Sequence, residues 1–314
     1  MRETESSGGG RTSASFRIPR VERGESAMPR CTRRDWLKAA SVLCGTAALG
    51  AGPEIILHAR EKIARYRQAT ALGPLKRKLP SIEDCCKLAK EIGFVGFDLC
   101  SPEYWPELKK HGLICTMTPS HKLTDGLADP KFHEACLKAI RESIDATAAA
   151  GFPNVITFSG NRRGMSDEEG LENCVKALKR VAGYAEKKKV TICLEFLNSA
   201  KTHPDYMADS TKWCVELVHR VGSERVKVLY DIFHAGMMGE DVVADIEKHA
   251  DCWGHYHTAG VPGRHEIDDS QTLDYPTIMR TIARTGYTGI VAHEFSPTRD
   301  LAESLKQAYA ICDV

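Results

Sequence analysis

The stretch VTICLEFLN, residues 190–198, indicates which fold to expect. It is short, apolar and rich in β-branched and aromatic residues, which is typical of a buried strand. The segment before it carries Val175, Leu178, Ala182 and Ala185 at helical spacing. Parallel strands need a crossover of a dozen or more residues between them, usually a helix, so this helix–strand pair predicts a parallel sheet.

The same unit recurs along the chain. A weak first strand is expected at 65–68, and stronger apolar runs occupy 93–100, 112–118, 154–160, 190–198, 226–234, 252–260 and 289–297. Most intervals carry amphipathic helical patterns, for instance 135–150 and 276–283. Eight strand–helix units in roughly 250 residues favour the α/β class and a single (β/α)8 TIM barrel over residues 60–314. A doubly wound open sheet is the alternative, but neither GxGxxG nor GxxxxGK follows the first strands.

The charge balance argues against some classes of partner. The 314 residues are 42% hydrophobic and include 43 basic and 42 acidic side chains, so the chain can bury a large core and has no bias towards a polyanion. A nucleic-acid binder normally shows clustered Lys and Arg. The basic run 187–189 has acidic neighbours on a helical pattern, so we interpret it as a solvated helix face and expect no nucleic-acid partner.

The first 52 residues differ from the rest. Residues 1–27 are rich in Gly, Ser, Arg and Glu, and we interpret them as a disordered extension or an overlong start, since Met28 can begin the chain. Residues 28–52 contain Arg33 and Arg34, then an uncharged stretch about half as long as the ~20 residues of a membrane span. This segment resembles a twin-arginine export signal, with Trp36 where such signals prefer Phe. The resemblance implies contact with the export machinery and a periplasmic location, and a surface helix is the alternative.

The cysteines do not require a disulfide framework, although the chain is expected to be exported. Of the 12 cysteines, ten follow residue 52, and they include no CxxC pair. A domain of this size needs no disulfides, so we expect most of them to be buried as small hydrophobic residues.

Four ligand-type side chains stand in the apolar runs of the last four strands. They are Glu195, Asp231, His257 and Glu294, each separated from the next by about one strand–helix unit. In a barrel the C-terminal strand ends carry the chemistry, and inward residues at one height converge. Three carboxylates and an imidazole at one point would repel and desolvate one another unless a divalent cation lay between them. Each residue taken alone is also compatible with a purely structural ion pair.

Two further histidines lie near this predicted site. In GHYHTAGVPGRHE, residues 254–266, His255 shares a face with His257 but lies one layer deeper, which favours a hydrogen-bonded core or supporting role. His234 follows Asp231 by three residues, past the expected strand end, where a turn into a helix would bring it over the site.

Residues 60–314 resemble the hydroxypyruvate isomerase-like and ketose 3-epimerase branch of the xylose isomerase-like TIM barrel superfamily. The stretches that carry the resemblance are FSGNRRGM (158–165), LEFLNS (194–199), LYDIFH (229–234), GHYHTAGVPGRHE (254–266) and HEFSPTRD (293–300). The resemblance implies that Glu195, Asp231, His257 and Glu294 bind Mn²⁺ or a similar ion. It also implies that Glu195 and Glu294 act as acid and base, and that His234 and Arg264 bind the substrate.

The chemistry of this residue set suits a carbon acid. A cation that chelates a carbonyl and the adjacent hydroxyl oxygen stabilises an enediolate, and carboxylates move the proton. Two proton carriers permit epimerisation and one permits aldose–ketose isomerisation, and both remain open. Mixed carboxylate and imidazole ligands favour Mn²⁺, with Mg²⁺, Co²⁺ and Zn²⁺ as rivals.

The expected substrate is a small carbohydrate, and export suggests an extracytoplasmic sugar or its oxidised derivative. Two alternatives to an isomerase remain, namely an exported sugar-binding barrel without catalysis and a metal-dependent hydrolase. The hydrolase would need more His ligands and a basic groove, which the charge balance disfavours. The sequence leaves homo-oligomer formation and the order in which the glutamates act open.

Replacing Arg33 and Arg34 together by Lys is expected to leave the protein in the cytoplasm, because paired guanidinium groups are what the twin-arginine pathway recognises. Cell fractionation measures this outcome. Unchanged export would favour the surface-helix interpretation instead.

Overall fold

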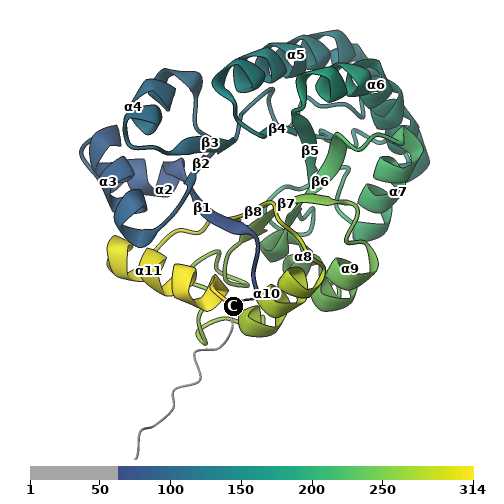
Figure 1. Cartoon of the computed structure of the whole chain (residues 1–314). Coiled ribbons are helices and arrows are strands. Elements are labelled where there is room, and N and C mark those ends of the chain that lie inside the picture. The colour runs from purple at the N-terminus through teal and green to yellow at the C-terminus, as the bar shows by residue number, and fades with distance from the viewer. Residues whose placement is uncertain (1–62) are drawn as a thin grey trace, which may run out of the picture. The chain divides into compact units, whose positions relative to one another are not determined.

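A computed structural model of the protein describes residues 63–314. The predicted extension at 1–27 and export signal at 28–52 lie outside the described residues. The described chain forms eight parallel strands alternating with helices, so the predicted TIM barrel is confirmed (Figure 1). The helices form a ring around the strands (Figure 1).

The strands follow one another around the barrel in chain order. They are β1 (Arg67–Ala71), β2 (Gly96–Asp98), β3 (Ile114–Met117), β4 (Asn154–Thr157), β5 (Thr191–Glu195), β6 (Val226–Asp231), β7 (Trp253–Thr258) and β8 (Ile290–His293). β1 pairs with both β2 and β8, and the ring closes where Thr118, just after β3, bridges Val155 of β4. The C-terminal ends of all eight strands therefore lie at one rim.

The helices lie between the strands and after β8, and those expected at 135–150 and 276–283 appear with small shifts at their ends. They are α2 (Leu72–Lys76), α3 (Ile82–Ile92), α4 (Trp105–Lys110), α5 (His133–Ala150), α6 (Asp167–Lys188), α7 (Thr211–Val221), α8 (Ile232–Met238), α9 (Val242–Lys248), α10 (Tyr275–Arg284) and α11 (Leu301–Cys312). Both ends of α3 are capped, because Ser81 Oγ accepts a hydrogen bond from Asp84 N and Gly93 ends the helix with φ 105°. None of the described helices has the length and apolarity that a membrane span requires.

Two strand predictions need correction. The first strand lies at 67–71 rather than 65–68. The predicted strand at 226–234 ends at Asp231, because the Asp231 side chain accepts hydrogen bonds from Phe233 N and His234 N and so begins α8. An acceptor at this position satisfies N–H groups that have no partner in the first turn, which favours helix over strand.

One layer of the barrel interior is apolar. Met117, Ile156, Cys193 and Leu229, from four strands, form one packed cluster inside the sheet. All ten cysteines of residues 63–314 are buried and free of disulfides, as predicted. This cluster therefore excludes water from the part of the barrel interior that it fills.

The loop after β7 is bound to the segment after β8. Gly260 N donates to His265 O, and a Cβ on Gly260 would lie 2.1 Å from Glu266 O, so no larger residue fits. The buried Glu266 carboxylate accepts hydrogen bonds from Thr298 N (2.9 Å), Thr298 Oγ1 (2.8 Å) and Ser304 Oγ (2.8 Å). Burial alone would raise the pKa of Glu266, but these hydrogen bonds outweigh it and lower the pKa to about 2.

Glu266→Gln is expected to lower the free energy of unfolding by about 1–3 kcal/mol at pH 7, because buried donors lose a charged acceptor. The folded-state pKa of Glu266 lies below its ordinary 4.5, so its contribution is complete above pH 4.5 and declines as the pH falls towards 2. Urea unfolding at pH 7 and near pH 3 measures the change. Asp269→Asn, an exposed change in the same loop, serves as the control, and a wild-type–variant difference that does not shrink at low pH would contradict the assignment.

Candidate functional site

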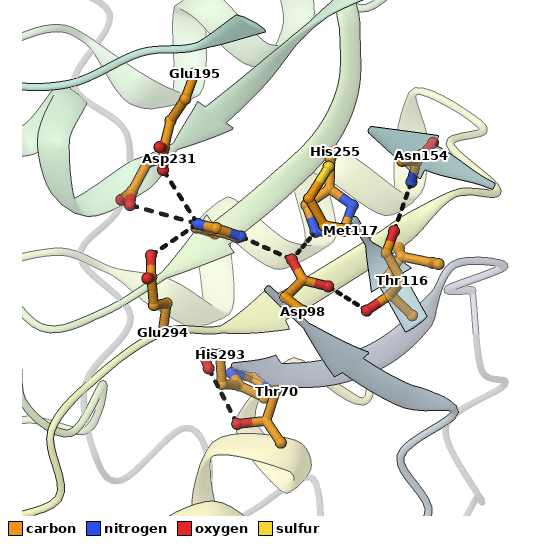
Figure 2. Close-up of polar contacts among 12 residues, drawn as sticks. Thr70, Asp98, Thr116, Met117, Asn154, Glu195, Asp231, His255, His293 and Glu294 are labelled. Atoms are coloured by element: carbon orange, nitrogen blue, oxygen red, sulfur yellow. Dashed lines mark hydrogen bonds and ion pairs between the residues drawn. The ribbon is translucent and has the colours of Figure 1, made fainter. Parts of the chain in front are cut away.

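The four predicted ligand residues meet at the C-terminal rim of the barrel. Glu195 and Asp231 are the last residues of β5 and β6, His257 is the penultimate residue of β7, and Glu294 directly follows β8. Asp231 and His257 are register partners in adjacent strands. Figure 2 shows the side chains of Glu195, Asp231 and Glu294 converging on one point, and each of them has an oxygen near His257 Nδ1.

The centre of this cluster is His257 Nδ1. Glu294 Oε2 lies 2.9 Å from it, Glu195 Oε1 3.5 Å and Asp231 Oδ2 3.7 Å. Within the described residues Nδ1 is buried and has no partner of hydrogen-bond geometry. Burial would lower the pKa of His257, but Glu294 and the other carboxylates outweigh burial and raise it well above its ordinary value. The three carboxylates therefore stabilise a positive charge at Nδ1.

These donors suit a divalent cation. One atom from each of the four side chains lies within 4.8 Å of the others, and only Glu294 is partly exposed. Three carboxylate oxygens and one imidazole nitrogen are ligands that Mn²⁺, Zn²⁺ and related ions accept. The buried His257 Nδ1 without a hydrogen-bond partner supports this fit. The predicted metal ligands thus come together, although their roles stay predictions.

Arg264 lies closer to the carboxylates than expected. Its Nη2 is 2.9 Å from Asp231 Oδ2 and 2.6 Å from Glu294 Oε2, and its guanidinium lies over the Phe233 ring at 4.7 Å. The one Lys or Arg within the four apolar runs, Lys227, binds Asp251 O away from the site, and the structure supplies the countercharge from the loop after β7 instead. In this structure Arg264 is thus an ion-pair partner of two predicted ligands, and its role towards substrate stays a prediction.

His234 lies over the site, as the sequence predicts. The first turn of α8 brings its Nε2 to 3.6 Å from Asp231 Oδ2 and 3.0 Å from Arg264 Nη1. Asn198 Nδ2 contacts the other ring nitrogen at 2.6 Å. Burial lowers the pKa of His234 to about 4, so this imidazole is neutral at pH 7.

The two glutamates differ in their affinity for a proton. Burial raises the pKa of Glu195 to about 7, and the nearby Glu294 adds to the increase while His257 opposes it. Burial would also raise the pKa of Glu294, but His257 and Arg264 lower it below its ordinary value. Carboxyl groups whose surroundings shift their pKa values in opposite directions are typical of an acid–base pair.

Three residues near the site were not predicted from the sequence. Asp98 of β2 accepts hydrogen bonds from His255 Nε2 (2.6 Å) and His257 Nε2 (2.8 Å), which confirms the supporting position predicted for His255. Asn198 holds His234, and the ring of His203 packs against His234 at 5.2 Å. The place of Asp98 inside the apolar run 93–100 could have indicated a buried role for it. Asn198 and His203 lie outside any periodic pattern and could not be identified in this way.

Sequence comparison connects the chain to known isomerases. A human protein described as a putative hydroxypyruvate isomerase is 25% identical over 183 residues, which cover 57% of this chain and 66% of that protein. The 2-oxo-tetronate isomerase of Haemophilus influenzae is 28% identical over 235 residues, covering 71% of this chain and 90% of that protein. The chain thus matches slightly less than two thirds of the human relative's length.

Solved structures share the fold. A protein from Brucella melitensis described as AP endonuclease, family 2, has a TM-score of 0.68 at 24% identity, covering 76% of this chain and 96% of its own. The D-psicose 3-epimerase of Clostridium cellulolyticum has a TM-score of 0.64 at 17% identity, covering 79% of this chain and 97% of its own. The family model described as xylose isomerase-like TIM barrel matches residues 86–311. The chain therefore belongs to the xylose isomerase-like TIM barrel family.

Proposed function

We propose that this protein is a metal-dependent isomerase or epimerase of a small keto-sugar or 2-oxo acid. The observation that carries the proposal is the convergence of two glutamates, Glu195 and Glu294, on one predicted metal position. The relatives described as hydroxypyruvate isomerase and 2-oxo-tetronate isomerase support the reaction class.

The metal ligands in this proposal are Glu195, Asp231, His257 and Glu294. A divalent cation held there, Mn²⁺ by our preference with Mg²⁺, Co²⁺ and Zn²⁺ as rivals, would stabilise negative charge on the substrate's carbonyl and hydroxyl oxygens when the carbon loses its proton. One of the two glutamates, Glu195 or Glu294, accepts that proton and the other returns one. Either can act first, and reversal of the reaction exchanges their roles.

The remaining polar groups of the site orient the substrate. Arg264 donates to a substrate oxygen, and neutral His234 offers a hydrogen bond without adding charge. Both side chains already contact the predicted ligands Asp231 and Glu294, so they would lie beside a chelated substrate. The loop bound by Glu266 holds Arg264 in that place.

Arg77 favours an anionic substrate over a neutral sugar. It lines a cavity of about 250 Å³ that Arg264 and Glu294 also line. Within residues 63–314 the Arg77 guanidinium has no hydrogen bond or ion pair, whereas its neighbours Lys76 and Lys78 bind Tyr104 and backbone carbonyls. An exposed guanidinium without a described protein partner, at a cavity that Arg264 and Glu294 also line, suits a carboxylate, as in a short 2-oxo acid.

Deuterium exchange tests the two-glutamate mechanism. Glu195→Gln and Glu294→Gln are expected to slow exchange at the substrate's carbon acid by about 10²- to 10⁴-fold, because the amide keeps an oxygen but loses basicity. Nuclear magnetic resonance in deuterated water over a panel of ketoses and 2-oxo acids with Mn²⁺ measures the rate. Glu240→Gln, which alters a carboxylate that binds Thr211 N outside the site, is the control. Wild-type exchange rates in both site variants would show that the glutamates are not the proton carriers.

Metal content tests the ligand set. Purified wild-type protein is expected to hold close to one divalent ion per chain, and Asp231→Asn is expected to lose it, because Oδ1 can still begin α8 while the charge is gone. Asp231→Ala should lose the ion as well. Asp241→Asn, which alters the equivalent residue at the start of α9, is the control. Full retention of metal in both Asp231 variants would remove Asp231 from the site.

Kinetics with Arg77→Met tests the substrate class. The Michaelis constant for 2-oxo acids is expected to rise about tenfold to hundredfold, as the loss of a charge-assisted hydrogen bond implies, while neutral ketoses are unaffected. Lys78→Met is the control, since Lys78 contacts Pro297 O outside the cavity lining. An equal change for acids and neutral ketoses would contradict the role of Arg77. If the wild-type protein binds sugars but catalyses no deuterium exchange with any of them, a sugar carrier is favoured over an enzyme.

A further inference from the structure

A buried carboxylate lies directly beneath the predicted metal site. Asp98, the last residue of β2, is completely buried inside the barrel. Its Oδ2 lies 2.6 Å from His255 Nε2 and 2.8 Å from His257 Nε2, and its Oδ1 accepts from Thr116 Oγ1. Figure 2 shows Asp98 beside His255 and apart from Glu195, Asp231 and Glu294.

These contacts determine which His257 nitrogen carries hydrogen. An ionised carboxylate only accepts hydrogen bonds, so each Nε2 that contacts Oδ2 must carry its hydrogen. In a neutral His257 ring the lone pair is then on Nδ1, the atom that faces Glu195, Asp231 and Glu294. Without Asp98 the hydrogen could move to Nδ1, and the ring could turn.

We propose that Asp98 is a positioning residue, which holds the His257 ring with the Nδ1 lone pair directed at the metal position, and that His255 keeps Asp98 in place. This inference rests on the proposed function, because it assigns Nδ1 to a metal ion. Carboxylates that accept the second N–H of a ligating histidine typically change metal affinity by about 10- to 100-fold when they are replaced.

The unpaired nitrogen of His255 supports its part in this arrangement. Its Nδ1 is buried and, within the described residues, has no hydrogen-bond partner, which costs free energy. An apolar side chain at this position would avoid that cost but would leave Oδ2 of Asp98 with a single donor. The imidazole of His255 is explained by its Nε2–H group, which donates to the same Asp98 oxygen as His257 does.

Neighbouring strands fix the other side of the carboxylate. Thr116 of β3 donates to Asp98, and Asn154 Nδ2 of β4 donates to the backbone carbonyl of Thr116 at 3.0 Å. Asp98 therefore connects β2 to β7 across the barrel interior, and β3 and β4 restrict its rotation. The direction of one predicted metal ligand thus depends on strands that contribute no ligand themselves.

The same three side chains, Asp98, His255 and His257, also present atoms close enough for a metal ion of their own. We favour hydrogen bonds, because both imidazoles approach one and the same oxygen at 2.6 and 2.8 Å, which is the ordinary length of a charge-assisted N–H···O contact. A second ion would require His257 to bind metal through both nitrogens. Two ions per wild-type chain, one of them lost in Asp98→Asn, would overturn the proposal.

Metal titration of the full chain tests the inference. Asp98→Asn is expected to bind Co²⁺ and Mn²⁺ about 10- to 100-fold more weakly in competition with a fluorescent chelator and to change the visible spectrum of the Co²⁺ form. His255→Leu should weaken binding in the same direction. His255→Gln should restore much of it, because the amide can present an N–H near the position of Nε2. Tyr66→Phe, which removes a buried hydrogen bond to Cys312 O outside the site, controls for lost stability.

The outcomes separate this inference from the proposed function. Wild-type protein that binds no divalent ion would remove the metal from the proposed function and this role from Asp98. Wild-type affinity and an unchanged Co²⁺ spectrum in Asp98→Asn would overturn the inference alone. If Asp98→Asn does not fold, the two His255 variants decide: equal affinity of the Leu, Gln and wild-type proteins would overturn the proposal. Absence of a downfield Nε2–H proton signal from His257 in metal-free wild-type protein would overturn it irrespective of metal.

Discussion

The concentration of three carboxylates around His257 Nδ1 is the constraint on which the rest of the site depends. Glu195, Asp231 and Glu294 all place an oxygen within 3.7 Å of this atom. Buried negative charges at such distances need positive charge among them. The protein provides it through His257 and Arg264, and in the proposed function a divalent cation would take the place of a proton at His257 Nδ1.

This constraint explains how the surrounding loops are built. Arg264 reaches the carboxylates because Gly260 permits a close chain approach and Glu266 attaches the loop to the segment after β8. Asp231 has two tasks, since Oδ1 begins α8 and Oδ2 faces the cluster. The same capping places His234 over the site, so the local helix start and the position of a substrate-binding candidate have one cause.

Much of the site could be predicted because its residues lie on strands. A strand directs alternate side chains to one face, and a barrel aligns its strand ends, so Glu195, Asp231, His257 and Glu294 could be assigned to one rim from their spacing. The end of β6 could not be placed, because the apolar run continues through Phe233 and only the cap stops the strand. Asp98 was missed although it stands in a predicted strand, because its partners come from the opposite side of the barrel.

The sequence by itself determined the eight strand–helix units and the residues able to bind a metal, because these depend on periodicity and residue type, and its motifs carry the resemblance to one family. Only the tertiary structure decided which hydrogen bond each side chain makes. The pairing of Arg264 with Asp231 and Glu294, the place of Arg77 in the lining of the same cavity, and the contact of Asp98 with His257 all bring together residues far apart in the chain. The closure of the barrel brings them together, and no local pattern records such a contact.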